Sequence, residues 1–174
     1  MTLRPAAPAD LPAVVTLVNA AYRGAGAQAG WTTEAAYIDG PRINLGLLQA
    51  DLDAQPQAML LVWREIPEGE ILGCVWLEPA AEEAWYLGML TVRPELQASG
   101  LGRRILEGAQ TAAAKAGARR LRMTVVNIRE SLIAWYQRRG YTLTEERRPF
   151  PYADNRFGKP RRDDLEFVVL EKAL

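Results

Sequence analysis

The residues best suited to chemistry lie in a short loop at the centre of the chain. This loop reads QASGLG from Gln97 to Gly102, and Arg103 and Arg104 follow it directly. Small residues let the backbone approach a ligand closely. The free N–H groups at the start of the next helix would favour an anion there, and the arginines add charged donors. The loop therefore predicts a cradle for a diphosphate, although a glycine pair that only shapes a tight turn would give the same pattern.

Two common phosphate-binding motifs do not fit this loop. A P-loop requires Gly-x-x-x-x-Gly-Lys-Ser/Thr, and the chain has no such run. A dinucleotide fingerprint requires a third small residue, whereas Gly100 and Gly102 are followed by Arg103, Arg104 and Ile105. The sequence therefore disfavours nucleotide hydrolysis and dehydrogenation.

The elements that would position this loop alternate along the chain. Hydrophobic periodicity, capping residues and glycine or proline breaks predict them. We expect strands at Thr2–Arg4, Ala58–Arg64, Ile71–Leu77, Ala84–Val92, Arg119–Val126, Tyr141–Glu145 and Leu165–Glu171. We expect a helix after an N-cap at Asp10 and a second, short helix that begins with Trp31–Glu34. We expect further helices at Ile43–Leu52, Gly102–Ala116 and Arg129–Arg139. The pattern predicts one mixed α/β (α+β) domain over residues 1–174, with a polar excursion over 147–162.

A larger pattern around the loop resembles motif A of the GCN5-related N-acetyltransferase (GNAT) family. The family signature is a Val-x-Pro strand end followed by Gln/Arg-x-x-Gly-x-Gly/Ala, which here begins at Val92 and ends at Gly102. A second family motif follows one strand later, where Asn127 ends a strand and AWYQRRGY over 134–141 forms a helix end. The resemblance implies a mixed, mostly antiparallel sheet of six or seven strands, splayed at a cofactor cleft and flanked by four or five helices.

The resemblance also assigns site residues. It implies an acetyl-CoA cosubstrate, pantetheine contacts on the strand, pyrophosphate contacts in the loop and a further contact from Asn127. The positions implied to contact acetyl-CoA are Leu90, Thr91, Val92, Gln97, Ala98, Ser99, Gly100, Leu101, Gly102, Arg103, Asn127 and Ser131. Tyr136 is the expected catalytic acid, because a phenol that titrates near 10 is a protonated donor at neutral pH. An aromatic ring packed on the sheet is the alternative for Tyr136.

The base that would deprotonate an amine is unassigned in the sequence. Many family members carry a glutamate on the strand before motif A, but Tyr86 stands at the corresponding position. Glu82, Glu83 and Glu34 are alternatives, each also explained as a solvated turn or a helix cap, and a water chain is another. The candidate residues on the acceptor side of the site are Trp31, Glu34 and Tyr86.

Two further segments resemble a pattern in part of the family, over 22–42 and over 149–165. We expect them to flank the acceptor, with arginines able to bind a carboxylate or phosphate. A small amine that bears an anionic group is favoured, and a peptide or protein amine is the rival. The alternative is that these arginines only solvate a long loop.

Composition narrows the function classes. Residues 1–96 hold 5 Lys/Arg and 12 Asp/Glu, and residues 97–174 hold 16 and 9, so the net charge is zero. This balance disfavours nucleic acid as a partner. Cys74 is the only cysteine and there is no histidine, so no disulfide, metal site or Cys or Ser triad is expected. Without a signal segment or an apolar span, we expect a cytoplasmic protein with no membrane partner.

Two functions remain open at this point. One is an acetyl-CoA-dependent N-acetyltransferase that works by direct attack in a ternary complex. The other is a catalytically inactive acyl-CoA-binding regulatory module, because the usual strand glutamate is missing. Family members are often dimers, so a homodimer is an expected assembly.

Overall fold

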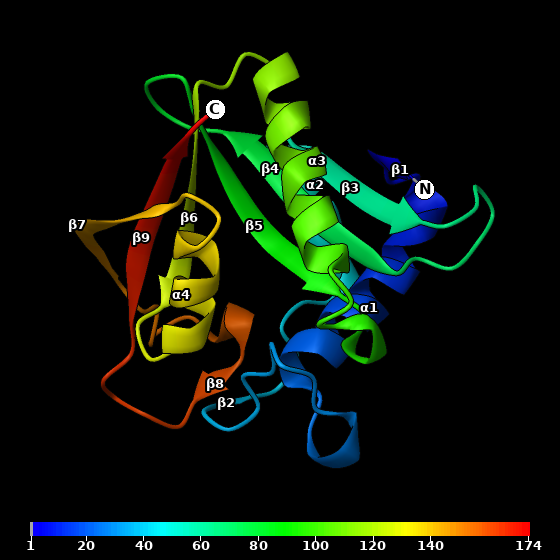
Figure 1. Cartoon of the computed structure of the whole chain (residues 1–174). Coiled ribbons are helices and arrows are strands. Elements are labelled where there is room, and N and C mark those ends of the chain that lie inside the picture. Colours follow the sequence, from blue (N-terminus) through cyan, green and yellow to red (C-terminus); the bar gives the residue numbers. More distant parts are fainter. Residues whose placement is uncertain (1) are drawn as a thin grey trace.

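The computed structural model describes residues 2–174, and a seven-stranded sheet forms its centre (Figure 1). The strand order is β1-β3-β4-β5-β6-β9-β7, with only β5 and β6 parallel. The strands are β1 (Thr2–Pro5), β3 (Met59–Arg64), β4 (Gly73–Pro79), β5 (Ala84–Val92), β6 (Arg120–Val126), β7 (Thr142–Pro149) and β9 (Glu166–Ala173). The predicted mixed, mostly antiparallel sheet is thus confirmed.

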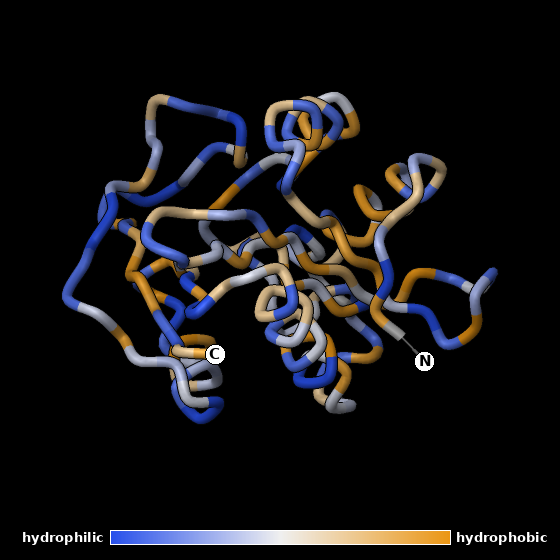
Figure 2. Tube along the Cα trace, turned by 90° about the horizontal axis from the view of Figure 1, so that it is seen from above, coloured by the Kyte–Doolittle hydropathy of each residue, from blue (hydrophilic) through white to orange (hydrophobic). Residues whose placement is uncertain are grey.

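Helices cover both faces of this sheet (Figures 1 and 2). On one face lie α1 (Leu11–Arg23) and α2 (Leu45–Ala54), and on the other lie α3 (Leu101–Lys115) and α4 (Glu130–Gln137). Strand alternation explains the two layers: Leu61 and Trp63 of β3 pack toward α3, whereas Leu60 and Val62 pack toward α1 and α2. Figure 2 shows hydrophobic residues concentrated in these central strands, with hydrophilic stretches at the periphery.

A small second sheet joins the two segments that the sequence linked to the acceptor. It pairs β2 (Ile38–Asp39) with β8 (Lys159–Pro160) in antiparallel register. The Arg161 N–H also donates to the Tyr37 carbonyl at 2.8 Å. Single turns of 3-10 helix complete the fold at η1 (Pro8–Asp10), η2 (Gly26–Gln28), η3 (Pro94–Leu96) and η4 (Asn155–Phe157).

The structure corrects three local predictions. Residues 31–34 do not form a helix, because Thr33 Oγ1 donates to the Gly24 carbonyl at 2.5 Å and the Glu34 carboxylate binds Arg23. Asp10 stands at the predicted N-cap position of α1, but its side chain makes no capping bond and instead accepts from Arg64 at 2.6 Å. The strand predicted to end at Glu145 continues to Pro149, so β7 takes up part of the expected excursion. The other strands and long helices begin and end within about two residues of their expected limits.

Candidate active site

The parallel strands β5 and β6 separate soon after they pair. Their register covers only Ala84–Tyr86 against Arg120–Arg122, and the rest of β5 has no partner on β6. A bulge in the β4–β5 pairing lies between Gly88 and Thr91, where Met89 has φ of 49°. A bulge bends its strand and increases the local twist, so β5 turns away from β6 at this point. The splay expected at the cofactor cleft is therefore present in the sheet.

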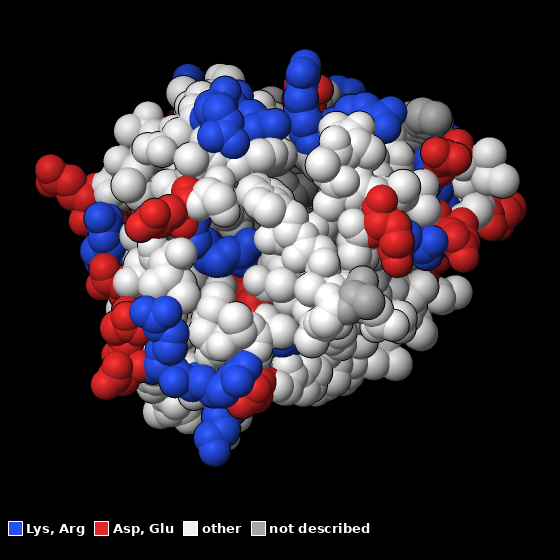
Figure 3. Space-filling model, turned by 60° about the horizontal axis from the view of Figure 1, so that its bottom comes forward, with Lys and Arg blue, Asp and Glu red and all other residues white. Residues whose placement is uncertain are grey.

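A cavity of about 470 Å³ opens where the strands separate. Its lining draws on three hydrophobic clusters, one under α3 and α4, one under α1 and α2, and one around β2. Figure 3 shows the face at the β2 and β8 end, with a hollow near its centre and basic side chains on parts of its rim. A volume of this size is typical of small-molecule sites.

The loop before α3 has the backbone geometry of an anion site. Gly100 is the N-cap of α3, with φ of 85° and ψ of −3°, a conformation that disfavours residues with a side chain. Within the described residues, the N–H groups of Gly100, Gly102 and Arg103 have no hydrogen-bond partner. Three free amides at the start of a 15-residue helix suit a diphosphate. The residues present therefore fit the pyrophosphate of acetyl-CoA.

Side chains around this loop connect it to β5 and to residue 32. Gln97 Nε2 donates to the Val92 carbonyl at 3.1 Å and to Thr32 Oγ1 at 2.9 Å. Ser99 Oγ donates to the Leu96 carbonyl at 2.6 Å, and Ala98 has φ of 67°. Leu101 is buried in the core below α3. Gln97 and Leu101 thus support the loop, whereas the exposed side chain of Arg103 pairs with Glu107 at 2.8 Å.

The part of β5 expected to bind pantetheine is held by side chains. Tyr22 Oη donates to the Leu90 carbonyl at 2.9 Å, from α1 across the cleft. Thr91 is 1% exposed, and its Oγ1 donates to the Met89 carbonyl at 2.9 Å. With Gln97 on the Val92 carbonyl, the carbonyls of Leu90 and Val92 both accept a protein hydrogen bond.

Asn127 and Ser131 follow β6. The Asn127 amide donates to the Asp164 carbonyl at 3.0 Å and accepts from the Glu166 N–H at 3.1 Å. These two hydrogen bonds of the Asn127 side chain connect the end of β6 to the start of β9. Ser131 is exposed in the first turn of α4.

Tyr136 lies on α4 and lines the cavity. The residue is 5% exposed, and its ring packs edge-on against Trp135 and Tyr141. Burial raises the pKa of Tyr136 well above its ordinary value, and neighbouring Tyr22 raises this pKa further. Among the described residues, its hydroxyl makes no hydrogen bond. The site thus holds a neutral phenol with an uncommitted O–H.

The candidate bases differ sharply in position. Glu82 and Glu83 lie in an exposed turn outside the cavity, and each pairs with an arginine of the 119–120 segment. Tyr86 lines the cavity and has its Oη 3.4 Å from Thr124 Oγ1. Sequence reasoning missed Glu78, which lines the cavity from β4 directly opposite Tyr86. Glu78 becomes recognisable only once β4 pairs with β5, because this pairing places it beside the usual glutamate position.

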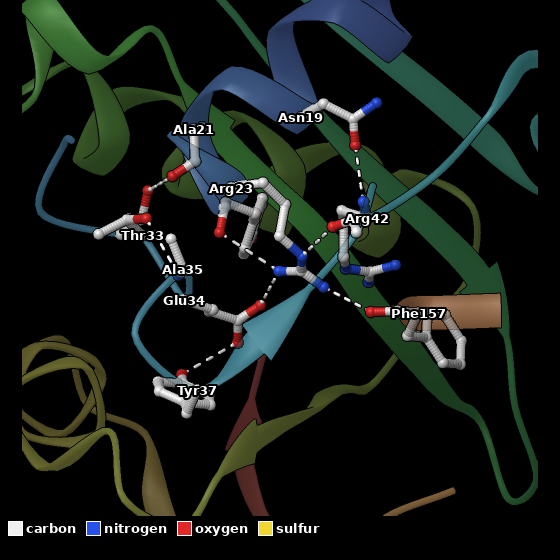
Figure 4. Close-up of polar contacts among 12 residues, drawn as sticks. Asn19, Ala21, Arg23, Thr33, Glu34, Ala35, Tyr37, Arg42 and Phe157 are labelled. Atoms are coloured by element: carbon white, nitrogen blue, oxygen red, sulfur yellow. Dashed lines mark hydrogen bonds and ion pairs between the residues drawn. The ribbon is translucent and has the colours of Figure 1, made fainter. Parts of the chain in front are cut away.

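Glu34 is buried in an ion network on the α1 side of the cavity (Figure 4). Its carboxylate lies 2.8 Å from Arg23 Nη1 and 3.7 Å from Arg129 Nη1, and it accepts from Tyr37 Oη at 3.3 Å. Glu34 is therefore a charge partner of two arginines. Trp31 is 47% exposed, does not line the cavity and packs 6.4 Å from the Trp135 ring.

The two flanking segments meet at the cavity as expected. Arg23 Nη2 donates to the Phe157 carbonyl at 2.5 Å, and Arg156 pairs with Asp51. Cys74 is fully buried on β4, beside β5, and burial raises its pKa to about 12, so it is no nucleophile. Within residues 2–174, no cluster of three metal-ligating side chains occurs, and no helix has the length and apolarity to cross a membrane.

Comparisons with known proteins agree with this geometry. The model of the acetyltransferase (GNAT) family matches residues 26–141. A ribosomal-protein-alanine N-acetyltransferase from Brucella melitensis superposes with a TM-score of 0.73 at 19% identity, covering 100% of both chains. The ribosomal-protein-S18-alanine N-acetyltransferase from Escherichia coli gives 0.69 at 17% identity, covering 99% of this chain and 92% of that one.

A third structure contains the cosubstrate. A GNAT family acetyltransferase from Elizabethkingia anophelis, solved with acetyl-CoA bound, gives a TM-score of 0.62 at 21% identity, covering 74% of this chain and 82% of that one. A comparison with curated protein sequences gave no match. The family match spans most of the chain and includes the splayed strand, the amide loop and the Tyr136 helix. The chain belongs to the GNAT acetyltransferase family.

Proposed function

We propose that this protein transfers the acetyl group of acetyl-CoA to an amine by direct attack within a ternary complex. The observation that carries the proposal is the opening of β5 from β6 beside an amide loop at the start of α3. The loop holds the diphosphate, and the cleft admits the pantetheine arm to the cavity. The acceptor enters from the side of α1 and α2.

The chain supplies a proton donor for the leaving thiolate. The amine nitrogen forms a bond to the acetyl carbon, the carbon–sulfur bond breaks, and the thiolate takes a proton. Tyr136 is our proposed donor, because it lines the cavity, stays neutral and has a hydroxyl that bonds to none of the described residues. A correctly placed general acid contributes about 10²–10⁴-fold to a rate.

The chain also offers a carboxylate for the proton of the ammonium group. Three carboxylates line the cavity, and two of them are paired with arginines: Glu34 with Arg23, and Asp51 with Arg156. Among residues 2–174, the Glu78 carboxylate accepts only the neutral indole N–H of Trp76, at 2.8 Å. It therefore remains available as a hydrogen-bond acceptor, and we assign the role of base to Glu78, directly or through one water.

Two measurements test this function. Calorimetric titration with acetyl-CoA should show one binding site per chain, and release of the CoA thiol should depend on an added amine. Binding without turnover on any amine would favour the inactive acyl-CoA-binding module. Absence of acetyl-CoA binding would contradict both functions.

A further inference from the structure

Two charged side chains of the cavity wall have no partner of opposite charge among residues 2–174. The carboxylate without an arginine is Glu78, and the arginine without a carboxylate is Arg42. The other charged groups that line the cavity form the pairs already described. The wall thus presents one uncompensated anion and one uncompensated cation to a ligand.

Arg42 is held by packing, not by polar contacts. Its guanidinium carbon lies 4.8 Å from the Phe157 ring centroid and 5.7 Å from the Tyr22 ring centroid. Within the described chain, the guanidinium donates no hydrogen bond and forms no ion pair, as Figure 4 illustrates. Only its backbone N–H is bonded, to Asn19 Oδ1 at 2.7 Å. Cation–π packing fixes the side chain and leaves its planar set of donors unused.

Arg129 adds a second free donor, and this one is buried. The residue is 8% exposed, and its Nη1 donates to the Thr32 carbonyl at 3.2 Å beside Glu34. Its Nη2 is buried and finds no partner in the part of the chain that the structure describes. A buried guanidinium nitrogen without an acceptor is costly. An anionic ligand atom in the cavity would satisfy it.

The two arginines belong to one continuous wall. Glu34 links Arg129 to Arg23, and Arg23 binds the carbonyl of the same Phe157 whose ring packs on Arg42. This wall contains three arginines, Arg23, Arg42 and Arg129, and the carboxylate of Glu34, so it carries an excess of two positive charges. Burial raises the pKa of Tyr22 to about 12, and the charges of Arg42 and Arg129 oppose that rise.

We propose that the acceptor is a small amine that also carries a carboxylate, which is bound by the wall that Arg42 and Arg129 form. Planar guanidinium donors match the geometry of a carboxylate. Glu78 would take the ammonium end. The cavity is also lined by the apolar side chains of Ile43, Leu47, Leu48, Phe150 and Phe167. An amino acid with an apolar side chain therefore suits it best. This proposal rests on the proposed acetyl transfer.

The test compares acceptors that differ only in the anionic group. Thiol release is measured with leucine and isoamylamine, and with phenylalanine and phenethylamine, at saturating acetyl-CoA. We expect kcat/KM to favour the amino acid by about ten- to hundred-fold, the range for hydrogen bonds to charged groups. Phosphoethanolamine and a peptide with an N-terminal alanine complete the panel. Higher kcat/KM on either of these, or on the decarboxylated amines, would overturn the proposal.

Substitutions then locate the carboxylate. Arg42→Gln should lose most of the preference for the amino acid while kcat/KM on the plain amine stays unchanged. Arg129→Gln should reduce the preference in the same direction. Arg42→Gln is the decisive variant, because among the described residues the Arg42 guanidinium bonds to no other group. Arg156→Gln is the matched control, because Arg156 lines the same cavity, packs on Phe157 and is already paired with Asp51. If Arg42→Gln keeps the preference for the amino acid over the plain amine, the assignment of the carboxylate to Arg42 is refuted. If the wild-type protein turns over none of the amines, the proposed function is refuted instead.

Discussion

Replacing Tyr136 with phenylalanine removes one oxygen atom from the cavity wall. The ring is 5% exposed and packs against Trp135 and Tyr141, and phenylalanine keeps both contacts. The hydroxyl makes no hydrogen bond among the described residues, so no protein group loses a bond. The substitution therefore tests chemistry with little change in packing.

The expected loss follows from the role of the hydroxyl. A general acid contributes about 10²–10⁴-fold, which corresponds to roughly 3–5 kcal/mol of transition-state stabilisation. The free energy of unfolding should change by less than about 0.5 kcal/mol, because no bond is broken. Burial raises the pKa of Tyr136 well above 10, so the wild-type rate should not fall through loss of this proton as the pH rises from 7 to 9.5.

The assay is thiol release under saturating acetyl-CoA, with calorimetry to confirm cosubstrate binding. Tyr141→Phe is the matched control, since Tyr141 packs edge-on against Tyr136 and does not line the cavity. It should retain wild-type kcat. An unchanged kcat in Tyr136→Phe, with acetyl-CoA affinity intact, would refute the acid role. Equal losses in both variants would instead indicate a packing effect.

Three further predictions concern the loop before α3, the hydrogen bonds of the Asn127 side chain and the buried Cys74. Gly100→Ala places a side chain at φ of 85°, at a cost of about 1–2 kcal/mol, and should weaken acetyl-CoA binding by calorimetry. Gly117→Ala, with φ of 98° at the other end of α3, should lower stability similarly without weakening binding. Asn127→Ala removes the side-chain hydrogen bonds to the Asp164 carbonyl and the Glu166 N–H. The free energy of unfolding, measured by urea denaturation, should fall by about 1–3 kcal/mol. Cys74, with its pKa raised to about 12, should react with Ellman's reagent only after denaturation; rapid reaction of the native protein would contradict its burial.

Local patterns made the cofactor half of the site predictable. The Val92–Gly102 loop joins a strand to a helix within a few residues, so its geometry depends on neighbours in sequence. Glycine at position 100 and the periodicity of the following helix define the amide cradle before any long-range contact is known. The second motif was predicted instead by the family resemblance, and in the structure Asn127 follows β6 and Tyr136 lies on α4.

The acceptor half depends on contacts between distant segments. The Thr-x-Glu spacing near residue 32 predicted a helix cap, but Glu34 pairs with Arg23 of α1 and Arg129 beyond β6. Glu78 gave no signal of its own, because its position becomes meaningful only when β4 pairs with β5 and places it opposite Tyr86. Sequence spacing records neither relation, since both arise from tertiary packing.

The strained part of β5 explains why the two halves are coupled. Once β5 leaves β6, its carbonyls need other partners, because a buried carbonyl without one costs roughly 1–3 kcal/mol. Tyr22 supplies the bond at Leu90, and Thr91 supplies the bond at Met89. Tyr22 also packs against Arg42, so one side chain touches both Leu90, an expected contact of acetyl-CoA, and the cationic wall. An acceptor bound by its carboxylate at that wall would therefore have its amine directed along Tyr22 toward the open part of β5.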